Sequence, residues 1–384
     1  MSFALSLKTA LRRDPVVTAV APPAAVVGKH FIALDGLRGI AILMVVILHF
    51  SPLLSPNGWE GTIRTACYPG YLGVTLFFVL SGFLITRILI QTRSNRDYFV
   101  TFFLRRALRI FPLYYAYIAF MILLYYPYSH YRVGEAYELD AHWLWYVAYA
   151  SNIRWDRFAD GGMMQLWSLA IEEQFYMVWP IVVFLTPRRW LLTVCGLGIA
   201  ASLACRVGMT MRGWSPALIY TWPTTRMDAL LAGAVIGIIE LNPDARERLV
   251  RALRPLTIAC LATIAALWGR WGLRSDNVAV YTWGWSVLAA FFALVVFWAA
   301  TAGGANRLLN IRWLRGLGKY SYGIYVLHMF PLMIIPRHFN TEDRSQRILS
   351  IAACVAATAV ATAFSWHFIE RPFLRRKQQL ASSR

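Results

Sequence analysis

The chain has 384 residues, of which 58% are hydrophobic and only 15% are charged, and its formal net charge is +19. This composition excludes an ordinary soluble globular protein, whose surface needs a larger share of charged residues. Apolar runs of about 20 residues recur along nearly the whole length, which is typical of a polytopic membrane protein built from α-helices.

The apolar runs predict an all-α integral membrane bundle of about ten transmembrane helices. Many of the 16 Trp and 19 Tyr stand near the ends of these runs, where aromatic side chains prefer the membrane interface. The segment 142–151 is aromatic but too short to span, so we expect an interfacial or re-entrant helix there. In chain order the expected spans are 30–50, 70–91, 106–126, 165–186, 190–210, 219–241, 254–271, 280–302, 318–336 and 346–370.

The basic residues alternate from one connection to the next instead of clustering in a soluble domain, which argues against a nucleic-acid partner. Under the positive-inside rule, the connections rich in Arg and Lys face the cytoplasm. The sequence therefore predicts that both termini are cytoplasmic and that the connection 127–164 faces outside. Most of the charge then reflects topology. The basic segments are 1–29, 93–109, 188–189, 246–254, 307–319 and 371–377.

We expect one membrane domain over residues 30–373, with a flexible cytoplasmic tail at 1–29 and a basic cytoplasmic tail at 374–384. The N-terminal tail lacks the apolar core and cleavage site of a signal peptide. The cysteines show neither a CxxC pair nor a His/Cys spacing typical of zinc, so no disulfide framework and no metal site is expected. The five cysteines are Cys67, Cys195, Cys205, Cys260 and Cys354.

The first span carries three ionisable residues, Asp35, Arg38 and His49, in an otherwise apolar helix. At 3.6 residues per turn, Arg38 and His49 lie within about 20° of the same face and about 16 Å apart, and Asp35 lies about 40° from that line. Charges in hydrocarbon are costly, so such residues normally face a bundle interior or a water-filled cavity. The three residues therefore predict a polar stripe that faces inward.

Other spans also place ionisable side chains at depth. A buried Arg–Asp pair or a single histidine is more often structural glue between helices than a catalytic group. Their number also fits transport of protons or substrate, or chemistry in a cavity. The residues are Glu172 and Glu173, Arg226 and Asp228, His328, and the group His367, Glu370 and Arg371 at the end of the last span.

Two further patterns flank these residues. Gly70, Gly73 and Gly82 in the second span indicate close helix packing. Arg105, Arg106 and Arg109 stand at the start of the third span, where Arg106 and Arg109 share a helix face. They are either topological anchors or a fork that binds phosphates bidentately.

These motifs together resemble the acyltransferase-3 family, membrane O-acyltransferases that modify polysaccharides, glycolipids and macrolide-type molecules. The resemblance covers about residues 30–373. Its motifs occur in order as LDGLRGIAIL…LHF, GVTLFFVLSGFLIT, FFLRRALRIFPLYY, LWSLAIEEQFY, RMDALLAG, LGKYSYGIYVLH and ERP.

The resemblance implies roles for particular residues. Many members carry Asp where this chain has Thr75, so no carboxylate role is expected at that position. Some relatives append a soluble esterase-like domain, and we expect the chemistry of this chain to be completed within the membrane domain. The family's functional motifs fall on Arg38 and His49, on Arg106 and Arg109, and on Glu172.

The implied reaction moves an acyl group, most simply acetyl, from cytoplasmic acyl-CoA to a hydroxyl at the outer side of a bacterial inner membrane. His49 is expected either to remove the hydroxyl proton or to carry the acyl group covalently. Arg38 is expected to stabilise developing negative charge or hold the donor, with Asp35 as its partner. Glu172 is expected to be catalytic together with His49 and Arg38. The supporting polar network would comprise Asp35, Glu173, Arg226, Asp228 and His328, and Arg105, Arg106 and Arg109 would bind the CoA phosphates.

The expected acceptor is a carbohydrate, a lipid-linked sugar or a secondary metabolite. Trp143, Trp145 and Tyr146 are expected either to stack on a sugar or to lie at the membrane interface. Two other functions remain open. A transporter or flippase would also carry charges at depth, although we see no internal repeat of the kind common in transporters. A non-catalytic scaffold would tolerate changes at His49.

Overall fold

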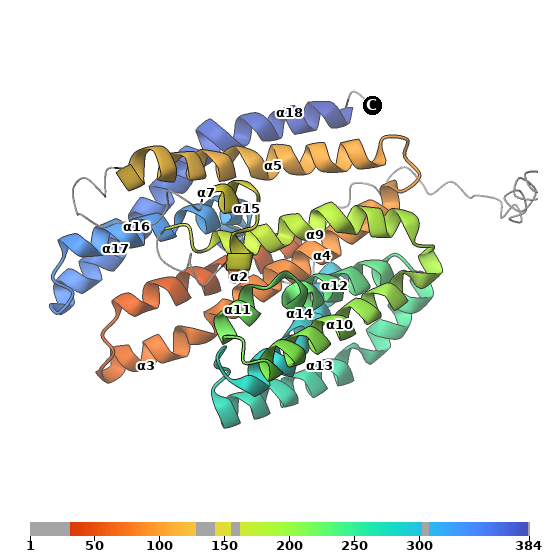
Figure 1. Cartoon of the computed structure of the whole chain (residues 1–384), viewed down its shortest axis with the longest axis horizontal. Coiled ribbons are helices and arrows are strands. Elements are labelled where there is room, and N and C mark those ends of the chain that lie inside the picture. Colours follow the sequence, from red (N-terminus) through yellow and green to blue (C-terminus); the bar gives the residue numbers. More distant parts are fainter. Residues whose placement is uncertain (1–30, 128–142, 155–161, 302–306, 383–384) are drawn as a thin grey trace, which may run out of the picture. The chain divides into compact units, whose positions relative to one another are not determined.

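The computed structural model describes residues 31–127, 143–154, 162–301 and 307–382, so the expected N-terminal tail lies outside the described residues. Phe31 to Arg384 group as one compact unit. Its described part contains helices and no β-strand, which confirms the all-α fold class (Figure 1).

The long helices occupy the positions of the expected spans. The helices are α2 (Ile32–Phe50), α3 (Gly58–Cys67), α4 (Leu72–Thr92), α5 (Tyr98–Phe120), α7 (Trp143–Val147), α9 (Leu166–Leu185), α10 (Leu191–Met211), α11 (Pro216–Thr221), α12 (Pro223–Glu240), α13 (Pro243–Trp271), α14 (Trp285–Thr301), α15 (Arg312–Leu327), α16 (Met329–Ile334), α17 (Arg344–Ser365) and α18 (Arg371–Ser382). Most of the long helices agree closely with the predicted limits, whereas α5, α13 and α15 begin well before them, at Tyr98, Pro243 and Arg312.

Among the described residues, eight helical stretches are long and apolar enough to cross a membrane. The remaining two expected spans are also helical, but α12 is more polar, and α15 has 16 residues and ends just before His328. Pro331 lacks the N–H that would continue the helix from α15, and α16 begins at Met329. The eight stretches are Ile32–Leu53, Gly58–Thr92, Tyr98–Tyr125, Leu166–Leu185, Arg188–Met211, Pro243–Trp271, Val280–Thr301 and Arg344–Arg376.

Two further segments contain shorter helices. The aromatic segment at 142–151 contains α7, a helix of five residues that is too short to span. The expected C-terminal tail begins within α18, which runs alongside α5 (Figure 1).

The helix α4 lies at the centre of the bundle, with most of its side chains buried, whereas α13 lies at the periphery. Glycine permits its closest contact: a Cβ added to Gly82 would stand 1.8 Å from the carbonyl oxygen of Leu230 on α12. Only a helix without a side chain at that point lets the backbones approach so closely. The close packing predicted for Gly82 is therefore confirmed.

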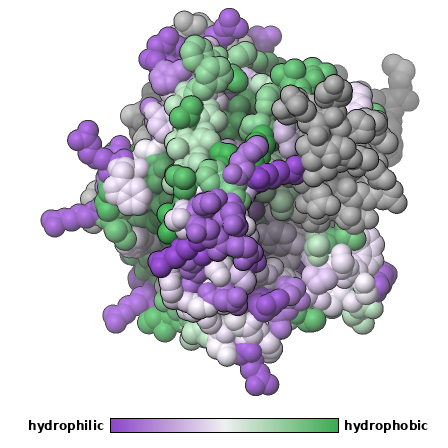
Figure 2. Space-filling model, turned by 90° about the vertical axis from the view of Figure 1, so that its left-hand side faces the viewer, coloured by the Kyte–Doolittle hydropathy of each residue, from purple (hydrophilic) through white to green (hydrophobic). Residues whose placement is uncertain are grey.

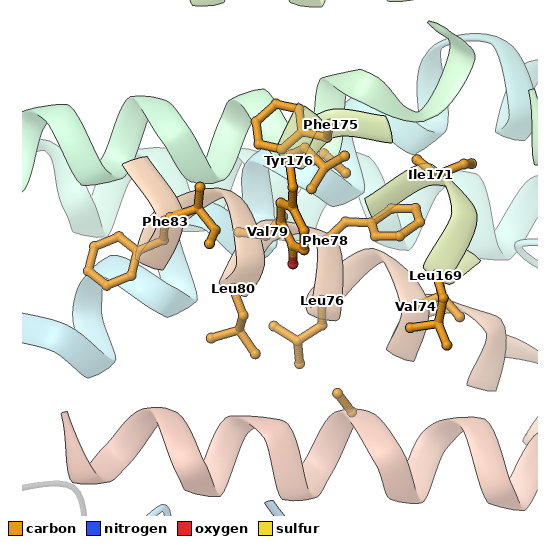
Figure 3. Close-up of a cluster of buried hydrophobic side chains, with 14 of the residues drawn as sticks. Val74, Leu76, Phe78, Val79, Leu80, Phe83, Leu169, Ile171, Phe175 and Tyr176 are labelled. Atoms are coloured by element: carbon orange, nitrogen blue, oxygen red, sulfur yellow. The ribbon is translucent and has the colours of Figure 1, made fainter. Parts of the chain in front are cut away.

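Apolar side chains of α4 and α9 fill the space between the two helices (Figure 3). Phe78 and Val79 lie among them, and Tyr176 extends from α9 toward α4 (Figure 3). This apolar contact fixes α9, and with it Glu172, relative to the centre of the bundle.

A buried ion pair joins α17 to α3 at one end of the bundle. Arg347 on α17 donates to both carboxylate oxygens of Glu60 on α3, at 3.0 and 3.1 Å. Such a bidentate pair fixes the two helices in orientation as well as distance. Figure 2 views this end, where hydrophilic residues spread over the centre and hydrophobic residues form a patch above them.

Candidate active site in two adjoining cavities

A cavity of about 300 Å³ opens among α2, α4, α5, α9 and α15. We call it the arginine cavity, because its lining includes the guanidinium groups of Arg38, Arg106 and Arg109. Glu172 also belongs to the lining, which otherwise consists mainly of apolar and aromatic side chains. A largely apolar cavity with a few convergent charged groups is the usual form of a ligand site.

The arginines come from two helices. Arg106 and Arg109 are one turn apart on α5, so both side chains reach the same cavity, as their spacing predicts. Arg38 comes from α2 and donates to Asp35 at 2.8 Å, one turn before it. Arg105 on α5 is outside the lining. The cavity therefore concentrates positive charge, with a carboxylate neutralising only part of it.

Glu172 is held in place by its own helix and by α4. The hydroxyl of Tyr176 donates to Oε2 of Glu172 at 3.0 Å, one turn further along α9. The same hydroxyl is hydrogen-bonded to Ser81 on α4. Glu173, the next residue, is buried but does not line the cavity. The structure thus separates the two glutamates that the sequence left together.

A second cavity, of about 230 Å³, contains His49 in its lining. We call it the histidine cavity. Aromatic rings form much of its wall, and Gln165 and Ser275 add polar groups. The rings are those of Tyr68, Tyr71, Trp167, Tyr220 and Tyr325.

The two cavities share part of their walls. Val74 on α4 and Tyr325 on α15 line both of them. The Tyr325 hydroxyl is fixed by the Ser168 hydroxyl at 2.5 Å and donates to the Gln165 carbonyl at 3.0 Å. Arg38 and His49, at the two ends of the polar stripe on α2, therefore face two cavities that adjoin at this wall.

His49 makes two contacts through its Nδ1 atom. The first is to the carbonyl oxygen of Val45, one turn earlier, at 2.9 Å. The second is to Nε2 of His328 at 3.2 Å. His328 in turn contacts the carbonyl oxygens of Tyr325 and Ile324 through its own Nδ1, at 2.8 and 3.2 Å. The sequence proposed both histidines but gave no signal that they meet.

Arg226 and Asp228 lie outside the lining of either cavity. Asp228 does not pair with Arg226: it accepts from Arg206 on α10 at 2.8 Å and from Ser286 at 2.7 Å. Arg226 donates to Thr75 at 2.8 Å, and its guanidinium carbon is 4.7 Å from the centre of the Trp285 ring. These contacts join helices, which is the structural role of buried polar groups.

The aromatic residues expected either to stack on a sugar or to lie at the membrane interface are outside both cavities. The helix α7 packs against α5, where Tyr114 donates to the carbonyl of Tyr146 at 2.8 Å. Neither Trp143, Trp145 nor Tyr146 lines a cavity described above. The aromatic lining of the histidine cavity was missed, although the sequence YPGY at 68–71 places two of its tyrosines just before the second span.

The chain is similar in sequence to known acetyltransferases. The chain is 27% identical to the peptidoglycan O-acetyltransferase OatA of Listeria monocytogenes over 370 residues, which cover 90% of this chain and 56% of that protein. It is 26% identical to the O-acetyltransferase OatA of Staphylococcus aureus over 376 residues, covering 91% of this chain and 58% of the relative. The chain thus spans little more than half the length of these relatives.

No solved structure matches the chain. A family model described as an acyltransferase domain matches residues 31–369, nearly all of the described unit. The matched range includes the cavity residues Arg38, Arg106, Arg109 and Glu172, and also His49. The chain belongs to the acyltransferase-3 family.

Proposed function

We propose that the protein is an integral membrane O-acyltransferase that moves an acetyl group from acetyl-CoA to a hydroxyl of a cell-envelope glycan. One observation carries the proposal. A cavity rich in arginine adjoins a second cavity that contains a histidine, and the two are separated only by a wall that includes Val74 and Tyr325. A charged donor and a hydroxyl acceptor can then approach one reaction point from opposite sides.

The arginine cavity suits the donor. Guanidinium groups bind phosphate oxygens through paired, charge-assisted hydrogen bonds. Arg106 and Arg109 face this cavity from adjacent turns, and neither forms an ion pair with a described residue. We assign the CoA phosphates to these two arginines, with Arg105 adding long-range attraction from outside the lining. Glu172 would limit the excess positive charge of the cavity.

His49 suits the role of general base. Its Nε2 atom would take the proton of the acceptor hydroxyl while the hydroxyl oxygen attacks the thioester carbonyl. As the C–S bond breaks, the same proton passes to the sulfur, so that CoA leaves as a neutral thiol. Arg38, which lines the arginine cavity about 16 Å along α2 from His49, would help to hold the donor. Attack by Nε2 itself, to form an acyl-histidine, is the alternative route with the same residue.

The histidine cavity suits a sugar. Its wall combines aromatic rings with the polar groups of Gln165 and Ser275, and the Oε1 atom of Gln165 is buried without a hydrogen-bond partner. A buried acceptor without a partner costs about 1–3 kcal/mol, which a ligand hydroxyl would recover. The named activity of the relatives, O-acetylation of peptidoglycan, supports an envelope glycan as acceptor. We place both termini in the cytoplasm and the histidine cavity toward the outer side.

The test is transfer by the purified full chain in lipid nanodiscs, with acetyl-CoA labelled in its acetyl group and soluble peptidoglycan fragments. We expect an alkali-labile label on the glycan, which is the mark of an ester. The rival function, a transporter or flippase, predicts movement of a solute across proteoliposomes with no ester formed. If no ester forms with peptidoglycan fragments or with other envelope glycans, the proposal is ruled out.

A further inference from the structure

His328 is one of the buried titratable groups that have no role in the proposed reaction. His328 is 0% exposed and contacts His49 from a different helix, with the ring centres 5.0 Å apart. It does not line either cavity, so it cannot touch a substrate there. A buried polar side chain is costly unless its hydrogen bonds are satisfied, so its partners indicate what it does.

The partners of His328 fix where its proton lies. Its Nδ1 atom is 2.8 Å from the carbonyl oxygen of Tyr325 and 3.2 Å from that of Ile324. A carbonyl oxygen only accepts hydrogen bonds, so Nδ1 must carry the proton. A neutral imidazole carries a single N–H, which leaves Nε2 of His328 as an acceptor.

The partners of His49 lead to the same conclusion from the other side. Its Nδ1 atom lies 2.9 Å from the carbonyl oxygen of Val45 and 3.2 Å from Nε2 of His328. Both of these atoms are acceptors, so Nδ1 of His49 carries the proton and donates to them. The lone pair of neutral His49 is therefore on Nε2, the atom that the proposed reaction uses.

We propose that His328 is a positioning residue that holds His49 in the tautomer whose Nε2 is free to act. The inference rests on the proposed function. In Ser-His-Asp sites a carboxylate orients the histidine in this way. The residues that line the histidine cavity include no Asp or Glu. Neutral His328 supplies a side-chain acceptor beside the carbonyl of Val45, and it still accepts from Nδ1 of His49 after Nε2 has taken a proton.

The packing of α15 against α2 brings the two histidines together. A Cβ on Gly318 would stand 1.8 Å from the carbonyl oxygen of Asp35 and 3.1 Å from the nitrogen of Gly39. His328 follows Gly318 by ten residues, and His49 follows Gly39 by the same number. Ten residues of helix advance about 15 Å, so two helices that run in the same direction from this contact bring the two side chains to one level.

The first test compares two substitutions at His328. His328→Gln retains an acceptor oxygen, whereas His328→Leu fills similar space without one. Loss of a residue that orients a functional histidine typically costs about 10- to 100-fold. We expect kcat to fall by about that factor in the Leu variant and much less in the Gln variant. The KM for acetyl-CoA should stay within about twofold, because neither variant alters the arginine cavity.

The control is His367→Leu. His367 makes the same bond one turn back along its helix, to Ala363 at 2.8 Å, but it is exposed and belongs to neither cavity. It should keep the wild-type kcat. A purely structural role for His328 predicts that the Gln and Leu variants lose activity equally, together with thermal stability, and that result would overturn the proposal. So would a Leu variant with the kcat of the wild type.

The second test reads the tautomer directly and needs no variant at His328 to fold. The chain has 7 histidines, so the ¹⁵N signals of ring-labelled protein can be assigned to His49 by their loss in His49→Gln. We expect a protonated Nδ1 and an unprotonated Nε2. The opposite tautomer in the wild type would overturn the inference. If the wild type forms no ester, the proposed function fails, while this measurement still decides the tautomer of His49.

Discussion

The side chain of His49 lines a cavity, and its hydrogen bonds fix the orientation of its ring. General base catalysis by a placed side chain contributes about 10²- to 10⁴-fold. We therefore expect His49→Gln to lower kcat by at least about 10²-fold while the protein remains folded and inserted. Ester formation on envelope glycan, measured beside size-exclusion profiles and melting temperature, checks both statements.

The matched control for His49→Gln is His367→Gln, which removes an imidazole from another helix outside the cavities. It should behave as the wild type. If His49→Gln also retains near-normal transfer, His49 is neither base nor acyl carrier, and the general-base and acyl-histidine routes fail together.

The pair Arg106 and Arg109 gives a prediction about the donor alone. A charge-assisted hydrogen bond contributes about 1.5–3 kcal/mol, so replacing either arginine by Gln should weaken acetyl-CoA binding by about 10- to 150-fold. Arg109→Lys should restore only part of the affinity, because the planar fork is absent. Calorimetric titration of CoA into detergent-solubilised protein measures this directly.

Arg96→Gln is the control for these arginines, since Arg96 is an exposed cation in the connection before α5. It should bind CoA as the wild type does. Unchanged CoA binding in the Arg106 and Arg109 variants would instead assign these arginines to topology, as anchors at the membrane surface.

At the scale of helices, the structural features that could be predicted from the sequence are those that depend on local residue spacing. The polar stripe of α2 was predicted because residues on one helix face follow from a period of 3.6. The contact between Arg38 and Asp35 is of this kind, and the structure shows it at 2.8 Å. The shared helix face of Arg106 and Arg109 is another feature that follows from local spacing.

The contacts that could not be predicted depend on how helices that are distant in the sequence pack against each other. Asp228 pairs with Arg206, which is 22 residues away on another helix, and no local pattern distinguishes Arg206 from the other cations of the chain. His49 and His328 are 279 residues apart in sequence. Their contact follows only once glycine has brought α15 against α2.

That glycine contact yields an element-scale prediction. A methyl group on Gly318 must displace the backbone of α2, whereas one on Gly316, two residues earlier on α15, meets open space. Both changes alter helix propensity by the same amount, about 1 kcal/mol in favour of Ala. We expect Gly318→Ala to lower kcat and melting temperature and Gly316→Ala to leave both unchanged or slightly raise stability. Equal behaviour of the two variants would contradict the close approach.

For the whole molecule, the Arg and Lys asymmetry predicts the orientation in the membrane. The exposed residue Thr341, between α16 and α17, should face outside, and the exposed residue Asp244, at the start of α13, should face the cytoplasm. In a background with Cys67→Ser, an impermeant maleimide added to intact cells should label Thr341→Cys. It should label Asp244→Cys only after the membrane is opened.

The labelling of permeabilised cells serves as the control, since both cysteines must then react. Labelling of Asp244→Cys in intact cells would show that the orientation in the membrane is opposite to the predicted one. It would also place the arginine cavity on the side that lacks cytoplasmic CoA, and so contradict the proposed direction of transfer.

The wall between the two cavities also bears on the membrane as an electrical insulator. A continuous water-filled path through the bundle would let protons run down their gradient, at a constant cost to the cell. Tyr325, with its hydroxyl fixed by Ser168 and Gln165, stands where such a path would pass. We expect Tyr325→Ala to raise proton leak in dye-loaded vesicles, and Tyr320→Ala, on the same helix but outside both cavities, to leave it unchanged. If vesicles that contain the Tyr325→Ala variant show no increase in proton leak, other residues seal the path. Under the proposed transfer, an intact wall would let only a small uncharged acyl group change sides, and the energised state of the membrane would be preserved during each turnover.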